Sequence, residues 1–253
     1  MIEAHGATDV GRRRKLNEDN FLVDERNRLY AVCDGMGGHN AGEVASRMAI
    51  EALSGFVTSS AAEREITWPW GIDANLSFDA NRLKTAIKLA NARVFQAADN
   101  REELTGMGTT VVATLVSGDA LTIGSAGDSR CYLVRKGELR QLTRDDSWVS
   151  AALGEGILNS DDVEHHPLRN VITKAVGARD SIDLDLIEHH LQPGDVVMLC
   201  SDGLHGMLND HELGRLLLPS PGPLEETTAR LVDAANEAGG RDNVTVVLLR
   251  RSE

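Results

Sequence analysis

The alternation of apolar and polar residues near the N-terminus predicts a β-hairpin followed by an amphipathic helix. In NFLVDERNRLYAVCD, two apolar runs flank the polar stretch 24–28, which is typical of a hairpin, and the second run ends at Asp34. From Ala41 onward, apolar residues recur at the spacing of one helix face. Asn40 is the expected N-cap of this helix, and Glu43 forms a capping-box-like pair with it.

A second amphipathic helix is expected at about 80–98, because apolar residues again recur on one face. Asp79 precedes this helix and is available as its cap. The stretch between the two helices, EREITWPWGIDANLS, is expected to form a connecting loop in which Trp68 and Trp70 pack onto the core.

The remainder of the chain is rich in short strands. The runs TTVVATLV, ALTIGSA, RCYLVRK and ELRQLT are separated by short turns and predict an antiparallel meander. A polar segment, 144–176, interrupts this pattern and reads as an inserted subdomain. Strands are expected again at DLDLIEHHL, DVVMLCSD and NVTVVLLR, with helices at about 210–218 and 224–238. Because strands and helices come in runs, the fold class is α+β with antiparallel sheets.

Composition limits the classes of function. The 253 residues are 42% hydrophobic, which suits one sizeable core. A formal net charge of -13 argues against a nucleic-acid partner, since binding to phosphate backbones needs clustered Lys and Arg. The N-terminal residues lack the apolar core of a signal peptide, and no apolar run has the length of a membrane span. We therefore expect a cytoplasmic protein without membrane insertion. The widely spaced cysteines Cys33, Cys131 and Cys200 are expected to be reduced core thiols.

Four aspartates lie at or near the ends of predicted strands. Asp34 follows LYAVC, Asp128 follows LTIGSAG, Asp202 follows VVMLCS, and Asp242 precedes NVTVV. Three of them have glycine as a neighbour, which lets a backbone turn sharply or approach a ligand closely. One such aspartate alone would be read as a turn residue. Four together would repel one another unless a cation neutralises them, and oxygen ligands favour Mg²⁺ or Mn²⁺ over zinc.

Other sites that could use these residues lack support in the sequence. The twelve-residue DxDxDG loop of an EF-hand does not occur. The glycine loop GMGGHNAG has no GKS or GKT and fails the GxGxxG spacing, so phosphate binding by this loop alone is weakly supported. There is also no GxSxG elbow and no cysteine in a phosphate-binding loop. A water activated by metal is the nucleophile that remains.

Eight segments in order along the chain resemble the bacterial, stand-alone form of the type 2C, metal-dependent serine/threonine protein phosphatases. They are RRRKLNEDN, DGMGGHNAGE, GMGTTVVA, AGDSRCYLVR, LTRDDSW, HHPLRNVITKAVG, LCSDGL and GGRDNVTVVLL. The resemblance implies a four-layer αββα sandwich of two antiparallel β-sheets flanked by helices. It also implies a single phosphatase domain over residues 1–253, with a flap subdomain at about 144–176 beside the active site.

The family pattern implies a set of metal ligands. Asp34 would bridge two metal ions, and the carbonyl of Gly35 would contact the second of them. Asp202 and Asp242 would complete the first. Asp128, together with Asp202, would hold a third and weaker ion. The cofactors implied are therefore two Mn²⁺ or Mg²⁺ ions with a further weak site.

The same pattern assigns the candidate catalytic residues Asp34, Arg14 and Glu18. Arg14 would bind the substrate phosphate, because a guanidinium can donate to two phosphate oxygens at once. Glu18 would act with Asp19 in holding waters bound to the metals. Two cations about 3.5–4 Å apart would lower the pKa of a bridging water, which would attack phosphorus in line.

The group that protonates the leaving oxygen is left open. Animal-type members of the family have a histidine after the DG pair, whereas this chain has Met36, as bacterial members usually do. A water on the metals is the first choice, because phosphoryl transfer has a loose transition state. His39 is the alternative general acid, against the ordinary reading of a structural loop histidine.

The function implied is hydrolysis of phosphoserine and phosphothreonine monoesters in proteins. The expected partners are phosphorylated proteins and a cognate bacterial Ser/Thr kinase system, and the expected state is a monomer. Two alternatives stay open at this stage: a catalytically inactive phosphoprotein-binding relative, and a phosphatase of anti-sigma-pathway regulators. An inactive relative would be expected to have lost metal aspartates, and the regulator phosphatases usually carry sensor domains.

Overall fold

The computed structural model contains two antiparallel β-sheets and describes every residue except 39–40, 63–66, 160–161, 163–165, 219–221 and 253. The five-stranded sheet has the order β1 (Ile2–Asp9), β11 (Val244–Arg251), β10 (Val196–Cys200), β7 (Arg130–Arg135) and β8 (Glu138–Gln141). The six-stranded sheet has the order β2 (Asp19–Asp24), β3 (Leu29–Met36), β5 (Val111–Ser117), β6 (Ala120–Ala126) and β9 (Asp185–His190), with β4 (Gly108–Thr109) beside β3.

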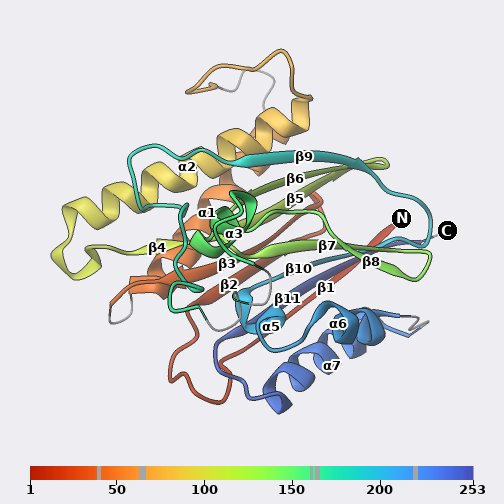
Figure 1. Ribbon diagram of the computed structural model, residues 1–253. Helices are drawn as coiled ribbons and strands as arrows, with labels where there is room; N and C mark the ends of the chain where they lie inside the picture. Colours follow the sequence, from red (N-terminus) through yellow and green to blue (C-terminus); the bar gives the residue numbers. More distant parts are fainter. Residues whose placement is uncertain (39–40, 63–66, 160–161, 163–165, 219–221, 253) are drawn as a thin grey trace.

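Helices cover the outer face of each sheet, which makes four layers (Figure 1). The long helices α1 (Ala41–Ala62) and α2 (Phe78–Asn100) pack on the six-stranded sheet, and α6 (Asp210–Leu217) and α7 (Leu224–Glu237) pack on the five-stranded sheet. The short helices are η1 (Glu102–Leu104), α3 (Trp148–Gly154) and α5 (Asp202–His205). The α+β class and the αββα arrangement expected from the sequence are confirmed.

Strand residues alternate between an inner and an outer hydrophobic layer. Along β3, the outer layer against α1 and α2 receives Leu29, Ala31 and Cys33, and the layer between the sheets receives Tyr30 and Val32. Strands β7, β10 and β11 alternate in the same way between the inner layer and the layer under α6 and α7. Strands that are apolar on both faces are required here because each sheet lies between two other layers. The three cysteines are free and buried in these layers.

The predicted hairpin is confirmed, but the predicted meander is wrong. β2 and β3 pair across the expected turn, and β5 pairs with β6. The chain then leaves the six-stranded sheet at residues 127–129, and β7 pairs with β10 and β8 in the other sheet. Strands that are apolar on both faces fit either sheet equally well. The hydrophobic pattern therefore predicted the strands and could not show the change of sheet.

The start of α2 and one tryptophan also differ from expectation. The N-cap is Ser77, whose Oγ accepts a hydrogen bond from the Ala80 amide at 3.0 Å, while Asp79 lies in the first turn. Trp68 packs against the core as predicted. Trp70 does not: it is 48% exposed, and its ring centroid lies 5.7 Å from Lys88 Nζ. The Asn40 cap predicted for α1 lies outside the described residues.

The first end of the inserted segment is bonded to the turn between β6 and β7, and its last end is bonded to the first. The Asp146 amide donates to the Gly127 carbonyl at 2.8 Å, and the Asp146 carbonyl accepts from the Thr173 amide at 2.7 Å. Within the segment, the ring of Trp148 stacks on that of His166 with centroids 4.8 Å apart. The flap stem is therefore joined directly to the loop that carries one of the predicted metal ligands.

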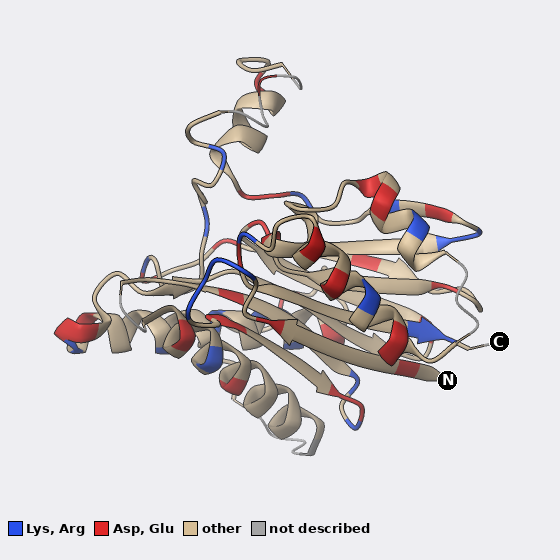
Figure 2. Cartoon of the chain, turned by 90° about the horizontal axis from the view of Figure 1, so that it is seen from below, with Lys and Arg blue, Asp and Glu red and all other residues tan. Residues whose placement is uncertain are grey.

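Charged residues of both signs are distributed over the described chain. Figure 2 shows red and blue segments interspersed along helices, strands and loops. Within the described residues, no helix combines the length and the apolar character that a bilayer-spanning segment needs.

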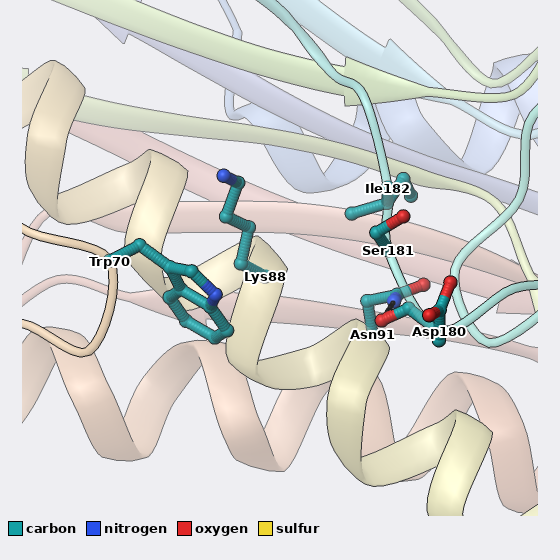
Figure 3. Close-up of a pocket in the computed structure, with 6 residues that line it drawn as sticks. All are labelled: Trp70, Lys88, Asn91, Asp180, Ser181 and Ile182. Carbon is teal, nitrogen blue, oxygen red and sulfur yellow. Dashed lines mark hydrogen bonds between the residues drawn. The ribbon is translucent and has the colours of Figure 1, made fainter.

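Asn91 joins α2 to the segment that follows the flap. Its side chain is 1% exposed, its Nδ2 donates to the carbonyls of Arg179 and Asp180 at 3.0 and 3.2 Å, and its Oδ1 accepts from the Gly177 amide at 2.8 Å. A cavity of about 160 Å³ lies beside it, between α2, Trp70 and residues 180–182 (Figure 3). The amide of one buried side chain thus satisfies three backbone groups.

We expect Asn91→Ala to lower the free energy of unfolding by about 2–4 kcal/mol, because it leaves buried backbone groups without hydrogen-bond partners. Urea denaturation followed by circular dichroism measures this change. Asn100→Ala is the matched control on the same helix, since Asn100 is exposed and bonds only locally to the Gln96 carbonyl. The control should change stability by less than about 0.5 kcal/mol. Equal effects of the two substitutions would contradict the role assigned to Asn91.

Candidate metal centre

The predicted acidic residues gather where the two sheets end. Asp19 and Asp34 are directly paired across β2 and β3 of one sheet. From the other sheet, Asp202 follows β10 as the first residue of α5, and Asp242 lies two residues before the start of β11. Asp128 lies in the turn by which the chain crosses between the sheets. Carboxylates from distant parts of the sequence are thereby brought to one end of the sandwich.

Asp19 links the ends of the two sheets. Its Oδ2 accepts hydrogen bonds from Ser201 Oγ at 2.7 Å and from Thr245 Oγ1 at 2.6 Å. Asp19 is buried, with only 5% of its surface exposed. Burial raises the pKa of Asp19 to about 7, the hydroxyl donors oppose that rise, and the charges of Asp202 and Asp242 add to it.

Asp34 is held through its backbone at the end of β3. Its amide donates to Thr110 Oγ1 at 3.0 Å, and its carbonyl accepts from Thr109 Oγ1 at 2.8 Å. Burial raises the pKa of Asp34 well above its ordinary range, and neighbouring carboxylates, first Asp19 and then Asp202, raise it further. The environment of Asp34 is therefore one in which a negative charge needs a cation.

Gly35 brings the start of α1 against the end of β3. The Gly35 amide donates to the Glu18 carbonyl at 3.1 Å. A Cβ at this position would collide with the carbonyl of Gly42 and would lie 2.6 Å from that of Glu18. Glycine is needed here because two backbone segments approach closely, which leaves room for the short DGMGG loop at the site.

Gly203 allows a similarly close approach of two backbone segments at the end of the five-stranded sheet. A Cβ on Gly203 would overlap the carbonyl of Asn243, so α5 can pack against the residues before β11 only with glycine here. This contact brings Asp202 and Asp242 together. Burial raises the pKa of Asp202, the charge of Asp242 raises it further, and a hydrogen bond with Asp34 partly offsets both effects.

Arg14 is the cation in contact with this group. Its Nη2 donates to Asp242 Oδ2 at 2.6 Å, and its Nη1 lies 4.0 Å from Glu18 Oε2. The Arg14 side chain is 48% exposed, so one side of the guanidinium faces solvent. The hydrogen bond to Asp242 raises the pKa of Arg14. Arg14 thus stands at the edge of the acidic cluster with a solvent-facing side.

Asn243 positions the loop that carries Arg14. Its Oδ1 accepts from the Glu18 amide at 2.8 Å, and its Nδ2 donates to the carbonyls of Val10 and Leu16 at 2.9 Å. These bonds fix both ends of the loop next to Asp242. The buried side chain of Asn243 therefore fixes the loop from which the Arg14 guanidinium extends.

Asp128 lies next to Asp202 and is buried to 9% exposure. Burial raises the pKa of Asp128 to about 7, with further contributions from the charges of Asp202 and Asp145. Its backbone carbonyl lies 3.0 Å from His205 Nε2. Burial, together with the nearby charge of Arg130, lowers the pKa of His205 to about 4, so this imidazole is neutral near pH 7.

The donor set fits hard divalent cations. Three buried carboxylate oxygens have no hydrogen-bond partner in the described chain: Glu18 Oε1, Asp19 Oδ1 and Asp202 Oδ1. Unpaired buried acceptors of this kind are costly without a positive partner. Within the described residues, no three His, Cys, Asp or Glu side chains are gathered tightly enough to be the full ligand set of one ion. Carboxylate oxygens are the donors that Mn²⁺ and Mg²⁺ prefer, so the chemistry of these side chains fits such ions. In this structure the carboxylate of Asp242 is hydrogen-bonded to Arg14.

The sequence identified the carboxylates but missed the residues that position them. Thr110, Asn243, Ser201 and Thr245 are polar residues inside or beside apolar strands, and that pattern was the available signal. Each is buried and hydrogen-bonded to a backbone group or carboxylate of the site. The candidate general acid His39 lies outside the described residues.

Comparison with known proteins gives one consistent result. A family model described as protein phosphatase 2C matches residues 10–248. The serine/threonine phosphatase stp of Listeria innocua is 35% identical over 258 residues, covering 99% of this chain and 96% of that protein. The crystal structure of the serine/threonine phosphatase PstP/Ppp of Mycobacterium tuberculosis has a TM-score of 0.86 at 34% identity, with 100% of this chain and 99% of that chain covered.

A second solved structure carries metal. It is the catalytic domain of the serine/threonine protein phosphatase PstP in complex with two manganese ions, with a TM-score of 0.84 at 32% identity, covering 100% of this chain and 99% of that chain. The family model and these relatives extend over nearly the whole sequence, and the two solved structures share its fold. The chain therefore belongs to the protein phosphatase 2C family, the metal-dependent serine/threonine protein phosphatases that its sequence motifs resemble.

Proposed function

We propose that this chain hydrolyses phosphoserine and phosphothreonine monoesters in proteins at the acidic cluster described above. The observation that carries the proposal is the meeting of Asp34, Asp202, Asp242 and Asp128 at one end of the sandwich. Among the described residues, buried carboxylate oxygens of Glu18, Asp19 and Asp202 at the same end have no hydrogen-bond partner. Such a group requires cations, and cations are what a negatively charged phosphate ester requires for attack. Arg14 stands at its edge with a solvent-facing side.

Asp34, the Gly35 carbonyl, Asp202 and Asp242 would hold two Mn²⁺ or Mg²⁺ ions, and Asp128 with Asp202 a third and weaker one. Support for manganese comes from the similar PstP catalytic domain, which was crystallised with two manganese ions. When bound, the ions would neutralise phosphate oxygens and lower the pKa of a water so that hydroxide forms near neutral pH. Glu18 and Asp19 would orient waters through their unpaired oxygens.

The protein side chains would bind and orient the phosphate. Arg14 can donate to two phosphate oxygens, for which it would exchange its bond to Asp242. Hydrolysis adds water to phosphorus and breaks the bond from phosphorus to the serine or threonine oxygen, which must then take up a proton. Met36 has no proton to give, so a water at the site and His39 stay the two candidates for this step.

The wider setting follows from the relatives and stays a prediction. Serine/threonine phosphatases act on phosphoproteins, so the expected partners are phosphorylated proteins and a Ser/Thr kinase that opposes this activity. The single domain over 1–253, the monomeric state and the cytoplasmic location are further predictions. We propose that the flap, 144–176, shapes access for protein substrates, because its stem is bonded to the loop of Asp128.

Turnover of an aryl phosphate and of a phosphothreonine peptide should require added Mn²⁺ or Mg²⁺. We expect Asp202→Asn to lower kcat/KM by about 100-fold or more, because it removes charge from a residue shared by the proposed ions. Asp233→Asn, on the exposed face of α7, makes the same change in net charge and should have no effect. Equal turnover of both substrates with and without metal would disprove the proposed activity.

Arg14→Lys should raise KM for the phosphothreonine peptide by about 10-fold or more, because a lysine cannot donate in the two-pronged geometry of a guanidinium. Steady-state kinetics at saturating Mn²⁺ measures the change. Arg13→Lys is the matched control, since this exposed neighbour carries the same charge in the same loop. If both variants shift KM equally, general attraction by the basic loop explains the effect and the specific role of Arg14 fails.

Metal binding should tighten as the pH rises. The folded-state pKa values of Asp19 and Asp128 are raised to about 7, and that of Asp34 is raised as well. A carboxyl group whose pKa is higher in the folded than in the unfolded state stabilises the folded state. This stabilisation is fully present below about pH 4, the unfolded pKa, and is lost as the pH rises through the folded pKa of about 7. A bound cation needs the charged form, so Mn²⁺ binding must displace protons from these groups.

We therefore expect the apparent Mn²⁺ dissociation constant to fall by up to about tenfold per pH unit between about pH 5 and 8 for each proton displaced. Titration calorimetry at pH 6.5 in buffers of different ionisation enthalpy counts the protons released. Asp128→Asn should release fewer protons than the unaltered protein. A dissociation constant that does not change with pH would contradict the assignment of these carboxyls to the metal centre.

A further inference from the structure

His205 connects two of the proposed metal ligands. It is the last residue of α5, the helix that begins with Asp202, and its Nε2 lies 3.0 Å from the backbone carbonyl of Asp128. A carbonyl oxygen can only accept a hydrogen bond, so Nε2 carries the hydrogen and donates it. One short helix therefore presents a carboxylate at its first residue and holds the backbone of a second carboxylate at its last.

Other hydrogen bonds fix the Asp128 loop to different parts of the molecule. Ser129 Oγ lies 2.7 Å from Thr110 Oγ1, which connects the loop to the segment beside Asp34. The Gly127 carbonyl accepts from the Asp146 amide at the flap stem, at 2.8 Å. In the part of the chain that the structure describes, the bond from His205 joins this loop to α5, the helix that begins with Asp202.

The neighbouring Arg130 does not compete for this role. Its guanidinium is engaged by the Asp145 carboxylate at 2.7 Å and by Tyr132 Oη at 2.8 Å. With the Arg130 guanidinium bonded elsewhere, the Asp128 carbonyl is left to the His205 ring.

We propose that His205 is a positioning residue, which fixes the Asp128 loop relative to the helix of Asp202 by donating Nε2–H to the Asp128 carbonyl. The proposal rests on the proposed function only in assigning Asp128 and Asp202 to the third, weaker cation. Two carboxylates repel each other, and without the bond the loop of Asp128 can relax away from α5. Residues that orient ligands in this way typically affect metal affinity by about 10–100-fold.

The test uses Mn²⁺ alone as the probe, with the full chain and no substrate. Free and bound Mn²⁺ are counted by electron paramagnetic resonance, which separates tight from weak binding. His205→Phe keeps a ring but has no donor, and we expect it to raise the dissociation constant of the weak class by about 10-fold, with the tight class unchanged. His205→Gln can place an amide N–H near the position of Nε2 and should stay within about threefold of the unaltered protein.

Asp128→Asn provides the second half of a double-mutant cycle. It should remove the weak class by itself, and adding His205→Phe to it should change Mn²⁺ binding no further. Thermal unfolding of each variant checks the fold, and His205→Met is a second variant without a donor, for use if the phenylalanine is not accommodated.

The proposal is overturned if His205→Phe leaves the weak class unchanged, if it weakens both classes alike, or if His205→Gln fails to restore binding. An unaltered protein with turnover but no weak class would also overturn it, while leaving the proposed function intact. Weak Mn²⁺ binding that depends on His205, in a protein without turnover, would support the role of His205 and overturn the proposed function.

Discussion

Mutual repulsion among carboxylates is the constraint on which the functional end of this molecule depends. Asp19, Asp34, Asp202 and Asp242 are held near one another by strands and loops from both sheets, and the charges of several of them raise the pKa of their neighbours. The stability of the sandwich keeps them there, because each residue is attached to a strand end whose neighbours are deep in the core. The packing of the core thus outweighs the repulsion between these carboxylates and keeps them in an arrangement that attracts cations.

The polar residues around the cluster make this arrangement specific. Hydroxyls of Ser201 and Thr245 stabilise one carboxylate oxygen of Asp19, and the other has no hydrogen-bond partner among the residues that the structure describes. Arg14 partly neutralises Asp242 from the solvent side. His205 holds the backbone of Asp128 and leaves its carboxylate available. The supporting groups therefore fix positions and leave carboxylate oxygens open, which is what a ligand set for hard cations requires.

The parts of the structure that could be predicted were those determined by local pattern. Helical spacing after Ala41 and the two apolar runs around the first turn predicted α1 and the β2–β3 hairpin, because those elements depend on neighbouring residues. The passage from β6 to β7 was predicted incorrectly, since strands that are apolar on both faces fit either sheet. Trp70 was predicted to be buried and is half exposed, because a large apolar side chain carries no local signal of where the loop will turn.

By itself, the sequence determined that aspartates at strand ends, with glycines beside them, could form the site, whereas Arg14 was singled out by the resemblance to a known family. It determined this because strand ends and tight turns are encoded by a few adjacent residues. Only the tertiary structure decided that Arg14 contacts Asp242, that Asp19 joins the two sheets and that His205 reaches the Asp128 carbonyl. These contacts join residues up to 228 positions apart in the chain, and their geometry depends on how four layers pack together.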